Sequence, residues 1–341
     1  MITPSARSAS ASASADFPLA VGPAMSASGG REAGLFTATL IAKQGLAAIL
    51  DEVAVRLGRE GGAGILEAVR WIEPDVAADL VFEPASQVAN ASRELARRIH
   101  DLARDAAAAP FDLDVVVQPT LGREKRLLVA DMDSTMITVE CIDELADYAG
   151  LKAEVAAITE RAMQGELDFE AALEARVRLL TGMPAETIDR CREERVRITP
   201  GAKALVRTMK ARGATCILVS GGFTRFAEPV AAEIGFDRVV ANVLEIANGR
   251  LTGEVRRPIV GAETKRQVLL NAAAELGIPL EATLAVGDGA NDIPMLETSG
   301  LGVAFRAKPA ARAAADAVID HGDLGALLYA QGIAHPEWVN G

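Results

Sequence analysis

The chain has 341 residues, a length that suggests about two domains at roughly 150 residues each. Its 35 lysines and arginines against 47 aspartates and glutamates give a net charge of −12, which disfavours general nucleic-acid binding because an acidic surface repels phosphate backbones. No uninterrupted apolar run approaches the roughly 18 residues that a membrane-spanning helix needs, so a membrane transporter is excluded. Half of the residues are hydrophobic and only 4% are aromatic, so we expect a globular core of Ala, Leu, Val and Ile.

The three cysteines, Cys141, Cys191 and Cys216, form no C-x-x-C pair, which excludes a zinc ribbon and a redox motif. Their odd number also argues against a disulfide scaffold and fits a reducing cytoplasm, so we expect a cytoplasmic protein. The three histidines lack the spacing of metal ligands. Any chemistry must therefore be carried by carboxylates and hydroxyls.

Residues 1–30 are mostly Ser, Ala and Gly. Such a segment has too little apolar surface to offset the entropy of ordering, so a disordered tail is predicted. It contains one early cation, Arg7, and no apolar stretch, so it is not a secretory signal. A transit peptide, a dispensable tail and a start at Met25 are the three interpretations, and we favour the last two.

The segment 35–118 predicts a small α+β domain with the element order βαββαβ. Strands are expected at 35–42, 67–72, 77–82 and 111–117, and helices at 45–57 and 88–104. This order resembles the ferredoxin-like fold of small amino-acid-binding regulatory domains of the ACT type. The resemblance is one of topology, and no residue here is assigned to ligand binding.

A linker is expected at 119–124, followed by an α/β domain over 125–328. Short apolar runs that end in polar residues are typical of buried parallel strands with a site at their carboxyl ends. These runs are 127–130, 216–219, 239–241 and 283–286. Between the first two, the stretch 142–199 is rich in Ala, Glu and Arg and predicts a helical cap. Asn248-Gly249 indicates a hairpin, and 310–318 indicates a last helix.

Two carboxylates, Asp131 and Asp133, follow the first strand of the α/β domain. Just beyond a strand the side chains no longer alternate strictly, so both can face one pocket. Two bare carboxylates repel and need a cation or a proton. A calcium loop is excluded because Thr135 replaces an acidic position and the loop glycine is missing. A solvated turn and a nucleophile with an acid–base partner over Mg²⁺ remain.

A second acidic cluster favours the catalytic interpretation. Asp288 and Asp292 follow another apolar strand and bring two more anions to the same end of the sheet. Carboxylate oxygens are ligands that suit Mg²⁺. Gly287 and Gly289 let the backbone approach closely.

Two further motifs are too common to indicate a function alone, and they gain one only in combination with the two acidic clusters. The hydroxyl of Ser220 and the amide of Gly221 follow a strand and could donate to phosphate oxygens, although a glycine-rich turn alone needs no function. Lys265 lies where a helix is expected to start, a position usually taken by a solvated lysine.

Together, D-M-D-S-T, S-G-G, the lysine and G-D-G-A-N-D resemble the haloacid dehalogenase (HAD) superfamily over roughly residues 125–320. The resemblance implies a Rossmann-like parallel sheet core with a helical cap insert. The second acid, Asp133, resembles the phosphatases and phosphotransferases of the superfamily, because dehalogenases lack it and P-type ATPases have D-K-T-G-T.

Positions in the insert extend the resemblance to the phosphoserine phosphatases. Glu140 lies nine residues after Asp131 and Arg176 forty-five after it, with Met163 and Phe169 before the arginine. In that family the glutamate holds the substrate ammonium and the arginine pairs with its carboxylate, which a guanidinium fork suits. Met163 and Phe169 would shield the pocket from water. Without the resemblance, Glu140 is a helix-start acid and Arg176 one of several helix arginines.

The resemblance also implies roles in catalysis. Asp131 attacks phosphorus and becomes an aspartyl phosphate, and Asp133 is first the acid and then the base. The implied metal is Mg²⁺, bound by Asp131, the backbone carbonyl of Asp133 and Asp288, with Asp292 holding waters or the lysine. The residues expected to bind the phosphoryl group are Ser220, Gly221, Lys265 and Asn291.

The implied reaction is hydrolysis of O-phospho-L-serine to L-serine and phosphate, the last step of serine biosynthesis. The alternatives are a phosphotransferase that passes the phosphoryl group to an alcohol such as homoserine, a broader small-molecule phosphatase, and a non-catalytic amino-acid sensor. No nucleic-acid or membrane partner is expected, and a homodimer is a hypothesis that the sequence leaves open.

Overall fold

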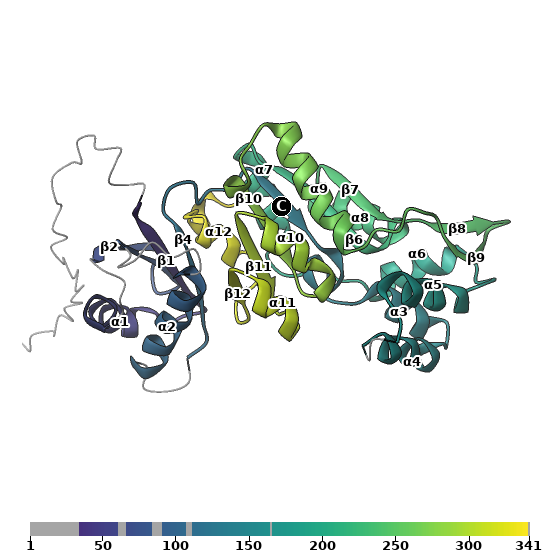
Figure 1. The fold of residues 1–341 in the computed structure, drawn as a ribbon, viewed down its shortest axis with the longest axis horizontal. Coiled ribbons are helices and arrows are strands. Elements are labelled where there is room, and N and C mark those ends of the chain that lie inside the picture. Colours follow the sequence, from purple (N-terminus) through teal and green to yellow (C-terminus); the bar gives the residue numbers. More distant parts are fainter. Residues whose placement is uncertain (1–33, 61–65, 84–90, 107–110, 164–165, 340–341) are drawn as a thin grey trace, which may run out of the picture.

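The computed structural model describes residues 34–60, 66–83, 91–106, 111–163 and 166–339 (Figure 1). The predicted tail at 1–30 lies outside these residues. Within the described ranges, no helix combines the length and apolar content that crossing a membrane requires.

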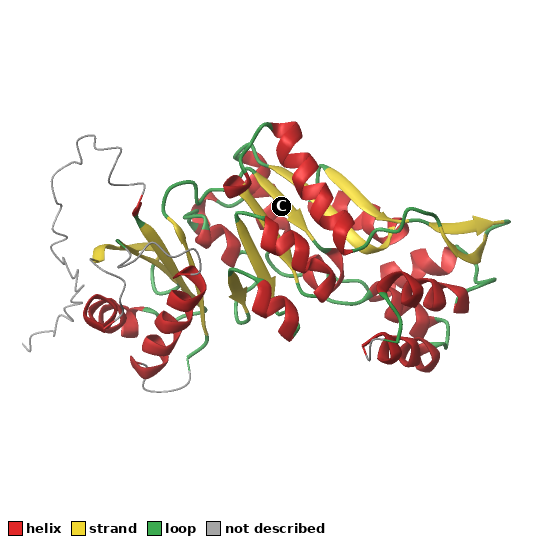
Figure 2. Cartoon of the chain, viewed as in Figure 1, coloured by secondary structure: helices red, strands yellow, loops and turns green. Residues whose placement is uncertain are grey.

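The first described part is a four-stranded antiparallel sheet with two helices on one face (Figure 2). Its elements are β1 (Phe36–Ala42), α1 (Ala47–Glu60), β2 (Leu66–Glu73), β3 (Ala77–Phe82), α2 (Ala91–Ala106) and β4 (Leu113–Pro119). Strands β3 and β4 flank β1, and β2 lies outside β3. Leu40 and Leu80 pack with Ile49 and Ile99 of the helices in a core of their own. The predicted α+β region before the α/β part is confirmed, and its sheet is antiparallel.

The α/β part is a six-stranded parallel sheet in the order β12-β11-β10-β5-β6-β7. The strands are β5 (Leu127–Ala130), β6 (Thr215–Phe223), β7 (Arg238–Asn242), β10 (Thr283–Gly287), β11 (Leu301–Phe305) and β12 (Ala317–Ile319). In β5, Leu128 and Ala130 face one layer of helices, and Leu127 and Val129 face the other. The strand is therefore apolar throughout because both of its faces are buried.

Helices cover both faces of the parallel sheet. On one face lie α7 (Ala202–Ala211), α8 (Thr224–Ile234) and α12 (Ala326–Ala330). On the other lie α9 (Ala262–Leu276), α10 (Ile293–Thr298) and α11 (Pro309–Ala314). The chain leaves β5 toward β6 on one side, while β10 pairs with β5 on the other. A crevice at the carboxyl end of such a central strand is where α/β sheets bind ligands.

A helical insert follows β5 and forms a separate lobe next to this end of the sheet (Figure 1). Its helices are α3 (Cys141–Tyr148), α4 (Lys152–Met163), α5 (Phe169–Leu179) and α6 (Glu186–Arg195). The hairpin of β8 (Leu244–Ala247) and β9 (Arg250–Val255) packs on this lobe, where the amide of Gly182 donates to Leu251. Asn248 and Gly249 have φ values of 53° and 73°, the left-handed turn that the sequence indicated.

The two sheets join into one ten-stranded sheet, which the sequence did not predict. Val318 of β12 pairs with Val115 of β4 in an antiparallel bridge. The prediction of a last helix over 310–318 is wrong beyond Ala314, because residues 317–319 pair with β11 on one side and β4 on the other. Long-range strand pairing overrides the helical propensity of this alanine-rich stretch.

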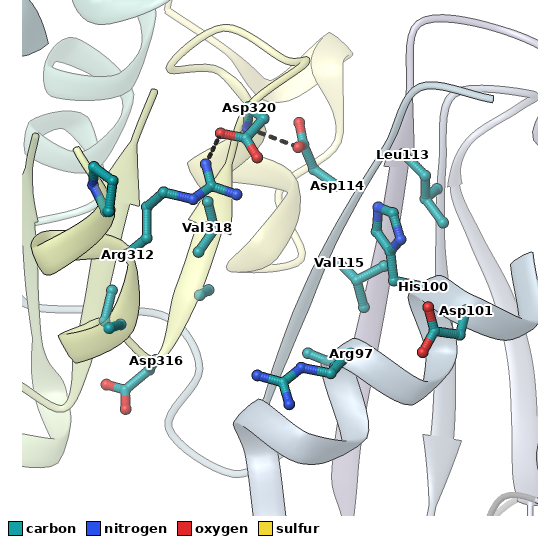
Figure 3. A pocket seen from close by; sticks show the side chains of 15 residues that line it. Arg97, His100, Asp101, Leu113, Asp114, Val115, Arg312, Asp316, Val318 and Asp320 are labelled. Carbon is teal, nitrogen blue, oxygen red and sulfur yellow. Dashed lines mark hydrogen bonds and ion pairs between the residues drawn. The ribbon is translucent and has the colours of Figure 1, made fainter. Parts of the chain in front are cut away.

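A cavity of about 570 Å³ lies at this junction, between α2 and β4 on one side and α11 and β12 on the other (Figure 3). Asp114 and Asp320 lie at one end of it, and Arg312 pairs with Asp320. None of the predicted catalytic carboxylates lines this cavity. Asp131, Asp133 and Asp288 line a smaller cavity at the carboxyl ends of the parallel strands.

We expect Asp114→Ala to destabilise the junction. The buried carboxylate accepts hydrogen bonds from the backbone amides of Asp320, His321 and Gly322, the shortest at 2.7 Å. Losing this acceptor leaves the amides unpaired and should lower the free energy of unfolding by about 1–3 kcal/mol, measured by urea denaturation. Asp112→Ala is the control, because that exposed carboxylate only pairs with His321 at 3.3 Å. Equal losses in both variants would contradict the expectation.

Candidate active site

A sharp turn after β5 brings Asp131 and Asp133 into one cavity. Asp131 ends the strand and accepts a hydrogen bond from the amide of Met132 at 2.8 Å. Residues Met132–Met136 form a wide helical turn, broken by extended backbone at Asp133 and by a left-handed conformation at Ser134 (φ 54°). The prediction that the two carboxylates share a pocket is confirmed.

The loop after β10 supplies the second acidic cluster. Asp288 follows the strand, and the buried Asp292 turns back so that its Oδ2 accepts from the amides of Asp288 at 3.1 Å and Gly289 at 2.9 Å. A Cβ atom on Gly287 would lie 2.4 Å from Cγ of Asp292. Only glycine therefore leaves room for the Asp292 carboxylate at this position.

Lys265 links the two acidic clusters from helix α9. Its side chain is fully buried, and its Nζ lies 2.6 Å from Oδ1 of Asp131 and 2.7 Å from Oδ1 of Asp292. Burial alone lowers the pKa of Lys265, but Asp131 and Asp292 outweigh it and raise the pKa above its ordinary value. The lysine is therefore a fixed positive charge inside the site, not the solvated helix residue that its local position alone favours.

The two carboxylates after β5 hold their protons more strongly than free aspartates. Burial raises the pKa of Asp131 well above its usual range, and the charge of Asp292 adds to this. Burial and the charge of Glu140 raise the pKa of Asp133 to about 6. The Asp133 carboxylate also accepts from the amide of Cys141 at 2.8 Å and from Oγ of Ser220 at 3.2 Å. Such a group can both donate and accept a proton near neutral pH.

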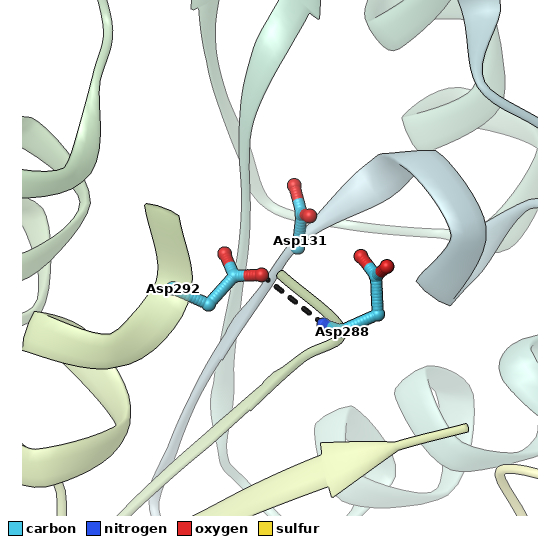
Figure 4. A group of neighbouring side chains, drawn as sticks. All are labelled: Asp131, Asp288 and Asp292. Atoms are coloured by element: carbon cyan, nitrogen blue, oxygen red, sulfur yellow. Dashed lines mark hydrogen bonds between the residues drawn. The ribbon is translucent and has the colours of Figure 1, made fainter. Parts of the chain in front are cut away.

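Three buried carboxylates could hold a metal ion. One oxygen from each of Asp131, Asp288 and Asp292 lies within 4.8 Å of the others (Figure 4). Burial raises the pKa of Asp288 to about 6, against the opposing charge of Lys308. The Lys265 charge is shared by two of the three carboxylates, so the cluster as a whole remains anionic and favours a further cation.

The end of β6 forms another wall of the cavity. Ser220 is buried, and its Oγ accepts from the amide of Gly222 at 2.8 Å. Gly221 lines the cavity together with Asn291, and a Cβ atom on Gly221 would lie 3.0 Å from the Phe169 ring. The glycine thus allows the cap to approach the sheet closely.

The cap side contributes three of the four predicted substrate residues. Glu140 precedes α3 and accepts from Oγ of Ser134 at 2.9 Å, and Phe169 begins α5. Arg176 donates from Nε to the carbonyl of Ala172 at 3.2 Å. Burial lowers the pKa of its guanidinium, while nearby carboxylates oppose this. All three line a cavity of about 300 Å³ together with Asp131 and Asp133.

Met163, the fourth predicted substrate residue, is the last residue of α4, and its side chain lies outside the described part of the structure.

The sequence reasoning missed Lys308. This residue precedes α11, lines the same cavity and lies within 4 Å of both Asp288 and Glu140. Like Asp131 and Asp288, it follows the carboxyl end of a sheet strand, here β11. This position after a strand could have marked Lys308 as a candidate site residue from the sequence.

The haloacid dehalogenase-like hydrolase family matches residues 128–297. The phosphoserine phosphatase of Albidiferax ferrireducens is 48% identical over 208 residues, which cover 60% of this chain and 88% of that protein. The chain belongs to the phosphoserine phosphatase family of the HAD-like hydrolases.

Some relatives are longer than this chain. The phosphoserine phosphatases of Streptomyces coelicolor (48% identical over 236 residues) and Mycobacterium tuberculosis (47% over 238 residues) each match 69% of this chain. The matched residues cover 57% and 58% of those two proteins. This chain therefore spans less than two thirds of their length.

Solved structures share the architecture. A HAD family hydrolase from Salmonella enterica is 30% identical with a TM-score of 0.74, over 87% of this chain and 98% of that one. A probable phosphoserine phosphatase from Vibrio cholerae is 30% identical with a TM-score of 0.68, over 90% of this chain and 89% of that one. A phosphoserine phosphatase solved as an analogue of its phospho-aspartyl intermediate is 41% identical with a TM-score of 0.56, over 60% and 97%.

Proposed function

We propose that this protein hydrolyses O-phospho-L-serine to L-serine and phosphate through a phosphoryl group carried on Asp131. The observation that carries the proposal is one cavity that holds a strand-end carboxylate beside a buried lysine and, on the cap side, both Glu140 and Arg176. The family supports the same reaction, since relatives with 48% identity are phosphoserine phosphatases.

The cap side fits a small zwitterion. The guanidinium of Arg176 would pair with the substrate carboxylate through two parallel hydrogen bonds, and Glu140 would hold the ammonium group. Phe169 and Leu173 supply apolar surface to the same cavity. A cavity of about 300 Å³ suits a ligand of this size.

The chemistry follows from Asp131 and Asp133. An oxygen of Asp131 attacks phosphorus, the bond from phosphorus to the serine oxygen breaks, and protonated Asp133 donates its proton to that oxygen. Asp133 then takes a proton from the water that releases phosphate. Its pKa of about 6 supports both roles near neutral pH. Ser220, the Gly221 amide, Lys265 and Asn291 would stabilise the phosphoryl oxygens.

Mg²⁺ fits the carboxylate cluster because its oxygen donors are the ligands that this ion prefers. Asp131, Asp288 and the backbone carbonyl of Asp133 would hold it. Asp292 would lie outside the ligand shell, since its oxygens already accept from Lys265 and from two amides. When bound, the ion neutralises Asp131 enough for a phosphate dianion to approach.

We also propose that residues 35–118 form a ferredoxin-like domain of the ACT type, in front of a catalytic domain at 125–328 with its cap at 142–199. The antiparallel strand order β2-β3-β1-β4, with both helices on one face, supports this assignment. A cytoplasmic location stays a proposal that the three free, buried cysteines support. A homodimer stays a proposal, to be tested by light scattering.

Phosphate release from O-phospho-L-serine in the presence of Mg²⁺ tests the proposed reaction. We expect rapid release that a chelator abolishes and added Mg²⁺ restores. Other phosphomonoesters, including phosphothreonine and para-nitrophenyl phosphate, should react more slowly. Release from the other esters but not from phosphoserine would reject the substrate. Faster turnover in added homoserine, with phosphohomoserine as product, would indicate a phosphotransferase.

A further inference from the structure

Lys308 lines the active-site cavity, yet the proposed reaction gives it no role. Its Nζ lies 3.5 Å from Oδ2 of Asp288 and 3.6 Å from Oε1 of Glu140. The first carboxylate belongs to the metal-binding cluster, and the second lies on the cap side. One ammonium group therefore pairs with both halves of the site at once.

The other cations near the cavity do not replace it. Arg176 lines the cavity, but in the described ranges it forms no ion pair within 4 Å of Asp288 or Glu140. Lys265 is committed to Asp131 and Asp292. Across the described ranges, no other lysine or arginine lies within 4 Å of a carboxylate oxygen of Asp288 or Glu140. The close ion pairing of these two carboxylates thus depends on Lys308, while the charge of Arg176 acts on Glu140 from a greater distance.

The Lys308 side chain can leave without moving the backbone. Its amide donates to the carbonyl of Asp288 at 2.9 Å, and its own carbonyl accepts from the amide of Arg312 at 3.1 Å, so the main chain is fixed. By contrast, the side chain is 65% exposed, and both of its ion pairs are longer than a normal hydrogen bond. The flexible lysine stem allows the ammonium group to swing into solvent.

We propose that Lys308 is a built-in counter-ion, displaced from Asp288 by a divalent cation and from Glu140 by the ammonium group of a ligand. Lys308 reduces the repulsion between carboxylates while the site is empty and turns outward when ligand cations take its two partners. It therefore sets the Mg²⁺ concentration at which the site fills. The part concerning Glu140 rests on the proposed function, and the part concerning Asp288 does not.

Calorimetric titration of the full chain with Mg²⁺, without substrate, tests the Asp288 part. We expect Lys308→Met to lower the Kd for Mg²⁺ on the order of tenfold, because a positive charge beside a ligand of a divalent ion is removed. The gain should shrink at high salt. The Kd of Lys308→Arg for Mg²⁺ should stay near that of wild type, because the positive charge is kept. Lys203→Met is the matched control for total charge and should change nothing, since Lys203 pairs with Glu233 on the helical layer away from the site.

An equal or higher Kd for Mg²⁺ in Lys308→Met would overturn the proposal. Should the methionine variant not fold, Lys308→Gln makes the same comparison. The Glu140 part is tested by two titrations. Lys308→Met should bind L-serine more tightly than wild type does. Its affinity for glycerate, which lacks the ammonium group, should equal that of wild type. If the variant also binds glycerate more tightly, by the same factor, the Glu140 part is wrong. If wild type binds no L-serine, the proposed function fails, while the Mg²⁺ titration still decides the Asp288 part.

Discussion

Asp131→Asn should abolish phosphate release while leaving the fold intact. The amide cannot attack phosphorus, so no aspartyl phosphate forms, and we expect turnover to fall by about four to six orders of magnitude. The substitution is nearly isosteric, and Lys265 keeps its ion pair with Asp292 at 2.7 Å. One of three neighbouring buried carboxylates is also removed, which relieves repulsion. The melting temperature should therefore change little.

Two measurements check this result. Rapid quenching of the wild type during turnover should trap phosphorylated protein, and peptide mass spectrometry should place the phosphate on Asp131; the variant should carry none. Asp147→Asn is the control, since this carboxylate lies on cap helix α3 and pairs with Arg195 outside the cavity. Turnover of Asp131→Asn within tenfold of wild type would reject Asp131 as the nucleophile.

Arg176→Ala should weaken recognition of phosphoserine and leave the phosphoryl-transfer step itself intact. The partly buried guanidinium projects from cap helix α5 and lines the cavity. Losing one member of a buried charge pair with the substrate carboxylate typically costs about 2–5 kcal/mol, so kcat/KM for phosphoserine should fall by roughly 30-fold to 4,000-fold. An aryl phosphate has no carboxylate, and its kcat/KM should change by less than about threefold, because the nucleophile and Lys265 are untouched.

The comparison of two substrates in one variant separates recognition from folding. Arg178→Ala is the matched control, because that residue lies on the same helix with an exposed side chain. It should leave both substrates unaffected. Arg176→Lys should recover part of the loss, since a lysine keeps the charge but not the planar fork. Equal losses on phosphoserine and the aryl phosphate would mean that Arg176 supports the cap structurally.

The sequence alone located the acidic clusters and predicted that they meet. Asp131 and Asp288 each follow a short apolar run, and such runs are recognisable because a strand buried on both faces has no polar positions. Parallel strands place their carboxyl ends at one edge, so strand-end residues converge whatever the strand order is. The sequence also predicted a close approach of the backbone at Gly287, next to Asp288. The structure shows the reason, because a side chain at this position would collide with Asp292.

Pairing between distant segments decided the rest. Lys265 has the local pattern of a solvated helix residue, and only the packing of α9 on the sheet buries it between Asp131 and Asp292. Lys308 gains its partners from Glu140 and Asp288 in the same way. Residues 317–319 became a strand because β11 pairs with them on one side and β4, some 200 residues earlier, on the other. Periodicity reports which face of an element is apolar but not what covers it, so buried charges and shared sheet edges follow only from the tertiary structure.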